Sequence, residues 1–253
     1  MWTQYLTGFH TDRPGVTELV LGRALTPTGN AYDWLAAAVP ARGRVLDVAC
    51  GSAPLESALP GRTYLGVDIA ATELAAARAR GATVVRASVT ALPVADASVD
   101  AVTCSMSLQV VTPLSAVLAQ TRRVLVPGGF LVATVPDRGP LQARDAPVLA
   151  ALLAALGRRL SYPNDEPLRR LPHLLAAAGL QPITDQRRRY AYPLRTSADA
   201  DLFLDSLYLP ELPPARYRAA RTVLHNLART RAVVPVPIRR VVATAALQRH
   251  DEP

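Results

Sequence analysis

Arg44–Pro54 reads RVLDVACGSAP and decides the fold of this chain. Its first half is an apolar run typical of a buried strand, and the small residues that follow favour a tight turn whose backbone can approach a ligand. The next stretch, 55–59, is compatible with a helix, so we expect a helix N-terminus with free N–H groups behind the turn. Asp47 stands inside the strand, where a carboxylate needs a partner, and it indicates polar function at the strand's end. The same pattern also fits a strand-to-helix turn of any doubly wound protein.

Strand and helix patterns alternate without a break from residue 44 to residue 136. Alternation of this kind predicts a parallel sheet with helices on both faces. Ligands of such sheets bind outside the carboxyl ends of the strands. After the first strand we expect strands over 63–68, 83–86, 100–104 and 130–135, and helices over 71–80 and 114–125.

A second acid, Asp68, ends the second predicted strand about twenty residues after Asp47. That is the spacing of a carboxylate that binds ribose hydroxyls in nucleotide-binding βαβ units. A dinucleotide fingerprint needs three glycines to pass a pyrophosphate, whereas this turn offers Ala49, Gly51 and Ala53. The turn therefore suits a ligand that has an adenosine and no phosphates.

Four stretches stand in a recognisable order: VLDVACG at 45–51, LGVD at 65–68, LPVADASVDAV at 92–102 and RVLVPGG at 123–129. Together they resemble the class I S-adenosylmethionine-dependent methyltransferases, in the type 11 small-molecule branch related to the ubiquinone/menaquinone enzymes. The resemblance covers roughly residues 30–136. It implies an α/β fold with a Rossmann-like, doubly wound, mostly parallel seven-stranded sheet, an antiparallel last strand and a helical insert.

The resemblance also implies that S-adenosyl-L-methionine is the cofactor and which residues contact it. These are Asp47, Ala49 and Gly51 in the first motif, Asp68 at the ribose, Ile69 over the adenine, Ser88 and Val89 at the adenine amino group, and Cys104 and Ser105 at the methionine amino group. Two positions depart from the family pattern. Ser88 stands where the family usually has Asp, and Val110, next to Gln109, stands where many relatives have His.

The chain is expected to form a single methyltransferase domain in three parts. Residues 1–28 form an N-terminal lid segment, 29–137 the cofactor-binding core, and 138–253 the substrate-side helices and the last two strands. Tyr5, Phe9 and Arg13 of the lid, with Gln109 of the core, are candidate substrate residues, and His10 is the candidate base. The alternative for the lid is that its aromatic residues simply attach the segment to the core.

Beyond residue 136 the motifs end and only element patterns remain. We expect helices over 148–156, 171–178, 197–207 and 214–231, strands over 182–192 and 238–247, and a frayed tail over 248–253. The helices of 197–231 are the candidate substrate insert, with 208–213 as its hinge or wall. The triplet Arg187–Arg189 lies on a predicted strand, so its side chains alternate between faces and do not form one cluster.

Composition bounds the remaining possibilities. The chain has 253 residues, a net charge of +8, and 28 basic residues that are all arginine; we expect these to be scattered on a solvated surface, without nucleic-acid binding. No apolar run reaches a membrane span, and the start lacks a signal peptide, so we expect a cytoplasmic protein. Cys50 and Cys104 are expected at the ends of adjacent strands as reduced thiols, and no cysteine or histidine cluster has metal-ligand spacing. The oligomeric state stays open.

The expected function is methyl transfer to a small-molecule acceptor by in-line displacement, mainly through positioning of the two reactants. Two alternatives remain at this point. One is a nicotinamide-dependent oxidoreductase, against which the replaced glycines argue. The other is a non-catalytic protein that retains the nucleotide-binding fold.

Overall fold

The computed structural model describes residues 2–246, so the predicted tail 248–253 and the last predicted strand residue lie outside the described part. The described chain divides into two compact units. Unit 1 combines residues 2–31, 136–161 and 187–238, and unit 2 combines 32–135, 162–186 and 239–246. The predicted lid segment therefore falls in unit 1, and the residues of the four motifs fall in unit 2. Strands β6 and β7 contribute residues to both units.

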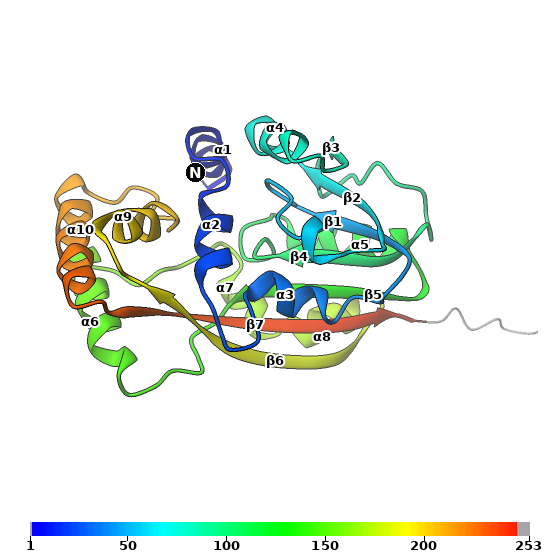
Figure 1. Cartoon of the computed structure of the whole chain (residues 1–253). Helices are drawn as coiled ribbons and strands as arrows, with labels where there is room; N and C mark the ends of the chain where they lie inside the picture. Colours follow the sequence, from blue (N-terminus) through cyan, green and yellow to red (C-terminus); the bar gives the residue numbers. More distant parts are fainter. Residues whose placement is uncertain (1, 247–253) are drawn as a thin grey trace, which may run out of the picture. The chain divides into compact units, whose positions relative to one another are not determined.

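The sheet has seven strands in the order β3-β2-β1-β4-β5-β7-β6 (Figure 1). Strands β1 to β5 pair in parallel, and the last strands run antiparallel, as predicted. Their bounds are β1 Arg44–Val48, β2 Thr63–Asp68, β3 Val84–Arg86, β4 Val99–Ser105, β5 Leu125–Pro136, β6 Leu180–Pro193 and β7 Val233–Ala245. Because β1 lies between β2 and β4, the three strands that carry Asp47, Asp68 and Cys104 end side by side.

Five helices belong mainly to unit 2: α3 Ala31–Ala36, α4 Ala71–Ala79, α5 Leu114–Val124, α7 Asp165–Arg169 and α8 Leu171–Ala177. Helix α5 shows how the sequence builds this unit. Its buried residues Leu114, Val117, Leu118, Thr121 and Val124 repeat every three or four positions, which gives one apolar stripe. The stripe packs into a core formed with the buried residues of the parallel strands.

The helix predicted behind the first turn is wrong. The stretch 55–59 was expected to be a helix behind the first turn, but it contains only the short 3-10 helix η1, Glu56–Ala58. Prolines stand at positions 54 and 60, and the segment between them has too few residues to nucleate an α-helix. The turn after β1 therefore has no α-helix N-terminus directed at a ligand, and its own backbone must provide the binding groups.

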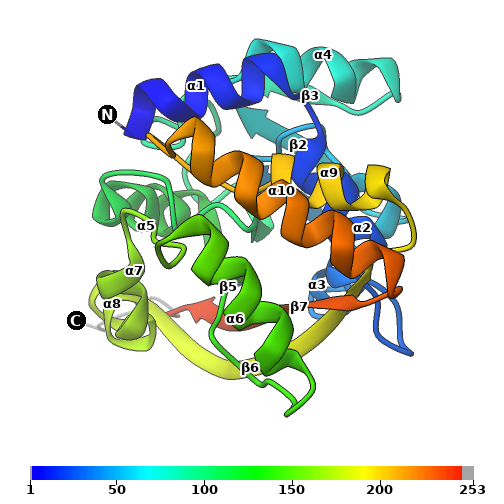
Figure 2. The same cartoon turned by 90° about the vertical axis from the view of Figure 1, so that its left-hand side faces the viewer.

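Unit 1 is built from five helices: α1 Trp2–Asp12, α2 Val16–Arg23, α6 Asp145–Leu156, α9 Ser197–Asp205 and α10 Pro214–Arg229. Helix α10 packs against α6 and α9, and α2 packs against α9 (Figure 2). Helix α9 begins with a capping box, in which Thr196 accepts from the backbone N–H of Asp199 and the Asp199 carboxylate accepts from that of Thr196. Such a box fixes where the helix starts.

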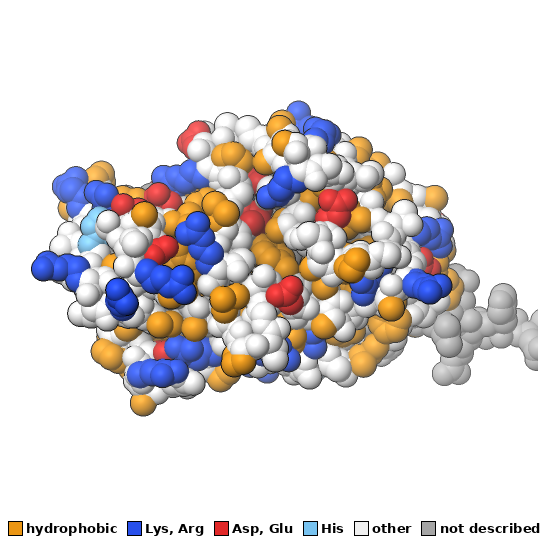
Figure 3. Space-filling model, in the orientation of Figure 1, with side chains coloured by type: hydrophobic (Ala, Val, Ile, Leu, Met, Phe, Trp, Pro, Cys, Tyr) orange, Lys and Arg blue, Asp and Glu red, His pale blue; other side chains and the backbone are white. Residues whose placement is uncertain are grey.

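The arginine triplet on β6 makes three separate contacts, as its alternation predicted. Arg187 forms an ion pair with Asp137 at 2.8 Å, Arg188 donates to Thr28 at 3.3 Å, and Arg189 pairs with Asp145. On the face shown in Figure 3, basic side chains lie among acidic and hydrophobic ones rather than in one continuous patch. Among residues 2–246, no helix is long and apolar enough to span a membrane.

Candidate functional site

The turn after β1 has an unusual backbone. Ala49, Gly51 and Ala53 all have positive φ, of 56°, 54° and 57°. For alanine this left-handed conformation costs about 1–2 kcal/mol per residue, so the surrounding contacts must hold it. One such contact runs from the backbone N–H of Gly51 to the Asp68 carboxylate, at 2.8 Å.

Asp68 joins the turns that follow two neighbouring strands. One carboxylate oxygen accepts from Gly51 N, and the other accepts from Ala70 N, also at 2.8 Å. A carboxylate has about four acceptor positions, so these two bonds leave capacity for the hydroxyls of a ribose. Ile69, beside it, is 63% exposed, which is unusual for a large apolar side chain and leaves a surface on which an adenine ring can lie. The residues present thus fit an adenosine.

Asp47 lies inside the sheet. It is 1% exposed, and its two oxygens accept from the Thr103 hydroxyl at 2.7 Å and from the Tyr64 hydroxyl at 2.8 Å. Burial raises the pKa of Asp47 to about 6, although the two hydrogen bonds act in the opposite direction. Its contacts connect β1 with β2 and β4, next to the turn that begins at Ala49. The expected contact of Asp47 with the cofactor stays a prediction.

The Asp47→Asn variant is expected to lose a pH dependence that the wild-type protein has. A carboxyl whose pKa rises from about 4 to about 6 on folding binds more protons in the folded state between these values, so the free energy of unfolding falls as the pH rises through that range. Two pKa units correspond to about 3 kcal/mol. Urea unfolding of both proteins at pH 4, 5, 6 and 7 measures the difference. Equal pH dependence in both proteins would show that Asp47 does not titrate in this range.

The side chain of Ser88 is engaged in a local turn. Its hydroxyl lies 2.8 Å from the Thr90 hydroxyl and accepts from Thr90 N at 3.2 Å. Ser88 and Val89 are half-buried in unit 2 and follow β3, the strand that pairs with β2. Their expected role at the adenine stays a prediction.

Cys50 lies just after β1 and Cys104 near the end of the adjacent strand β4, close to the predicted positions, and neither forms a disulfide. They are 5% and 0% exposed, and burial raises the pKa of the Cys104 thiol. The Cys104 side chain is part of the core. A contact with the methionine amino group would therefore be made by the backbone of Cys104 and by the half-buried Ser105.

The segment after β4 is held by a residue that sequence reasoning missed, Asn164. Its side-chain amide donates to the carbonyls of Leu108 and Val111, both at 2.7 Å, and its backbone N–H donates to the Gln109 carbonyl at 3.1 Å. Gln109 itself is 2% exposed, and its amide donates to the carbonyl of Met106, which has a positive φ of 51°. Gln109 thus supports the turn from within, while its expected contact with a substrate stays a prediction.

Asn164→Ala is expected to destabilise unit 2 by about 2–4 kcal/mol, because the buried carbonyl of Leu108 and the partly buried carbonyl of Val111 lose their donor at about 1–3 kcal/mol each. Asn226→Ala is the matched control, since Asn226 is exposed on α10 and the change favours helix. Urea denaturation measures both. If both variants unfold at the same urea concentration as the wild type, Asn164 does not hold the segment.

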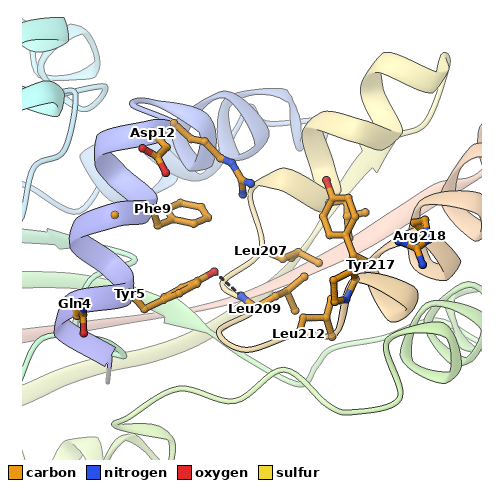
Figure 4. Close-up of a pocket in the computed structure, with 13 residues that line it drawn as sticks. Gln4, Tyr5, Phe9, Asp12, Leu207, Leu209, Leu212, Tyr217 and Arg218 are labelled. Carbon is orange, nitrogen blue, oxygen red and sulfur yellow. Dashed lines mark hydrogen bonds between the residues drawn. The ribbon is translucent and has the colours of Figure 1, made fainter.

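Unit 1 contains a pocket of about 650 Å³. Figure 4 shows α1 on one side of it and the segment after α9, with α10, on the other. Its lining residues are Gln4, Tyr5, Gly8, Phe9, Asp12, Arg13, Leu204, Leu207, Leu209, Leu212, Pro214, Tyr217 and Arg218. Three of the four candidate substrate residues, Tyr5, Phe9 and Arg13, are therefore brought together with the predicted insert; Gln109 belongs to unit 2.

His10, the candidate base, is directed at the insert. Its Nε2 lies 3.0 Å from the hydroxyl of Tyr208, and its ring also contacts that of Phe9 edge to face. Phe9 and Tyr208 are in turn 4.7 Å apart, edge to face. Within residues 2–246, no group of three or more His, Cys, Asp or Glu residues is arranged to hold a metal ion.

Comparison with known proteins assigns the motif region. Residues 46–133 match the family model described as a methyltransferase domain. A demethylmenaquinone methyltransferase of Mycobacterium sp. (strain KMS) is 42% identical over 91 residues, which are 35% of this chain and 40% of that protein. The chain thus matches less than half the length of this curated relative.

Two solved structures share the fold across both units. The [4+2]-cyclase SpnF is 20% identical with a TM-score of 0.58, and the match covers 96% of this chain and 93% of that one. The phosphoethanolamine N-methyltransferase 2 of Haemonchus contortus, solved with S-adenosylhomocysteine, is 14% identical with a TM-score of 0.58, covering 97% and 60%. At these identities the likeness concerns the fold alone.

Residues 46–133 thus match a methyltransferase domain, and the chain shares its Rossmann-like fold with these two solved structures. In this region the chain is similar to demethylmenaquinone methyltransferases over less than half of their length.

Proposed function

We propose that this protein transfers a methyl group from S-adenosyl-L-methionine to a small-molecule acceptor. The main support for the proposal is the position of Asp68 at the end of β2, inside the region that matches the methyltransferase domain. Its carboxylate accepts a hydrogen bond from Gly51 N in the turn after β1 and can still accept further hydrogen bonds. The same fold also occurs in a cyclase, so fold likeness alone would not support this activity.

In this proposal the chain's own residues bind and orient the reactants. The cofactor supplies an electrophilic methyl group on a sulfonium. Asp68 and Ile69 would hold the ribose and the adenine, and the turn of Ala49 and Gly51 would approach the methionine part. The displacement has a neutral thioether as its leaving group, so alignment of donor and acceptor is the main task, worth up to about 7–11 kcal/mol.

The unit 1 pocket is the proposed acceptor site, and α1 the proposed lid. Support comes from Tyr5 and Phe9, which line the pocket from α1. His10 does not itself line the pocket, but it contacts the lining residue Phe9, and we propose it as the base for an acceptor that must lose a proton, acting through the Tyr208 hydroxyl 3.0 Å from its Nε2. We also propose a cytoplasmic location, where thiols such as Cys50 and Cys104 stay reduced.

The name of the relatives makes a reduced naphthoquinone the first acceptor to test. The protein is incubated with methyl-labelled S-adenosylmethionine and reduced 1,4-naphthoquinone, together with a panel of phenols. We expect the label to appear in an extracted product, and not with Asp68→Ala. In a parallel assay with NADH and oxidised 1,4-naphthoquinone, protein-dependent oxidation of NADH, without transfer of label in the first assay, would contradict the proposal and favour an oxidoreductase.

A further inference from the structure

One wall of the unit 1 pocket is apolar, while Gln4, Asp12, Arg13 and Arg218 are the polar residues of its lining. Figure 4 shows Phe9 and Tyr5 projecting from α1 toward Leu207, Leu209 and Leu212 on the facing segment. Phe9 and Leu209 are buried, at 6% and 9% exposure, although both line the pocket. A surface of aromatic rings and leucines attracts apolar groups by removing them from water, at about 25 cal/mol per Å².

The two tyrosine hydroxyls at this pocket are already engaged by the protein. The Tyr5 hydroxyl accepts from the backbone N–H of Leu209 at 2.8 Å. The Tyr217 hydroxyl donates to the Asp205 carboxylate at 2.6 Å, and its pKa is raised to about 12, mainly by burial, so it stays neutral. A ligand that places hydroxyls against the aromatic and leucine wall would lose their hydrogen bonds to water and find few replacements there, at a cost of about 1–3 kcal/mol for each group left unsatisfied.

Arg13 adds a directional donor to this apolar surface. Its guanidinium carbon lies 5.6 Å from the centre of the Phe9 ring, and one N–H donates to the Asp205 carbonyl at 3.3 Å. The group thus lies over an aromatic ring and contacts the end of α9. A guanidinium has five N–H donors, so it can also bind an oxygen of a ligand that lies against Phe9.

We infer that this pocket binds a molecule with a flat, apolar ring system and one anionic or strongly accepting oxygen group, the ring lying against Phe9 and the leucines and the oxygen group at Arg13. As the identity of the methyl acceptor this rests on the proposed function; as a binding site it rests on unit 1 alone. The volume of about 650 Å³ lies in the range of about 300–1,000 Å³ that small-molecule sites occupy, and it accommodates two or three fused or linked rings.

The test uses two fluorescent probes with the full-length protein. N-phenyl-1-naphthylamine has the rings without a charge, and 1-anilinonaphthalene-8-sulfonate has the rings and an anionic group. Both are expected to bind saturably at one site. Leu212→Gln should weaken both by about tenfold, because it places an amide in the apolar wall, whereas Leu19→Gln, on the 52% exposed Leu19 of α2, should change neither.

Two further variants separate the parts of the inference. Arg13→Gln should weaken the sulfonate probe about fivefold and leave the uncharged probe unchanged. Leu212→Trp keeps the wall apolar but fills the pocket, so it should also exclude both probes while thermal melting stays that of the wild type. Melting curves of every variant show that it is folded.

Absence of saturable binding, or equal binding by Leu212→Gln and Leu19→Gln, overturns the inference. Equal effects of Arg13→Gln on both probes overturn the role of Arg13. Titration of the wild type with S-adenosylhomocysteine separates this inference from the proposed function. Probe binding without S-adenosylhomocysteine binding contradicts the methyl transfer and retains the pocket; the reverse result contradicts the pocket and retains the methyl transfer.

Discussion

Asp68→Ala is expected to lower the affinity for S-adenosylhomocysteine by about a hundredfold, or about 2.7 kcal/mol. Hydrogen bonds to a charged group contribute about 1.5–3 kcal/mol, and the proposed bonds to the ribose are of this kind. The carboxylate also accepts from Gly51 N and Ala70 N, so the substitution releases the left-handed turn of 49–53 as well. Calorimetric titration measures the effect.

Asp96→Ala is the matched control for that substitution. The Asp96 carboxylate is 77% exposed and pairs with Arg123, so its removal should leave cofactor affinity unchanged. Asp68→Asn keeps the size of the side chain and one acceptor oxygen, and should bind between the wild type and Asp68→Ala. If Asp68→Ala is folded and binds as tightly as the wild type, the assignment of Asp68 to the ribose is wrong.

The second large effect concerns stability. Asp145→Ala is expected to lower the free energy of unfolding by about 3 kcal/mol, because it leaves the Arg189 guanidinium without its carboxylate. The two side chains are 1% and 11% exposed, and Asp145 also accepts from Gln142 N at 2.8 Å. This pair fixes the start of α6 to β6, and α6 supports α10, which lines the pocket.

The control for Asp145 is a surface ion pair. Glu166 and Arg169 are 72% and 58% exposed, so Glu166→Ala should cost less than about 1 kcal/mol. The Arg189 hydrogen bonds lower the pKa of Asp145, so the stabilisation is present above about pH 4 and is lost as the pH falls through the folded pKa. Urea unfolding at pH 7 and pH 3 measures both. If Asp145→Ala lowers the free energy of unfolding by as little as Glu166→Ala does, the pair of Asp145 and Arg189 does not stabilise the fold.

The parallel core was predictable because its signals are local. Each strand is a short apolar run bounded by turn residues. Strands that alternate with helices along the chain typically form a parallel sheet. In a parallel sheet the strand ends meet at one edge, so the sequence alone predicts that Asp68 and the turn of Gly51 lie near each other. The spacing of the two acids then indicated an adenosine.

The parts that were missed depend on contacts between distant residues. Helix α1 contains Thr3, Thr7 and Thr11, weak helix formers of which two bond back to the preceding turn. Its aromatic residues find partners about two hundred positions away, as Tyr5 does at Leu209. Asn164 likewise acts on carbonyls more than fifty positions earlier, and no local pattern shows it.

The last strand shows a different limit. It was expected over 238–247, but β7 begins at Val233 and includes Pro235 and Pro237. Proline lacks the N–H that a central strand donates, so the prolines argued against a strand here and the predicted start was placed too late in the chain. The two prolines are alternate residues, so both missing donors face the same side of the strand.

Cofactor binding is tested most directly by calorimetric titration of the wild-type protein with S-adenosylhomocysteine and, in parallel, with NAD. We expect saturable binding of one S-adenosylhomocysteine per chain, weakened by Asp68→Ala and unchanged by Asp96→Ala, and no binding of NAD. Binding of NAD in its place, or no binding of S-adenosylhomocysteine by the folded protein, would contradict this expectation.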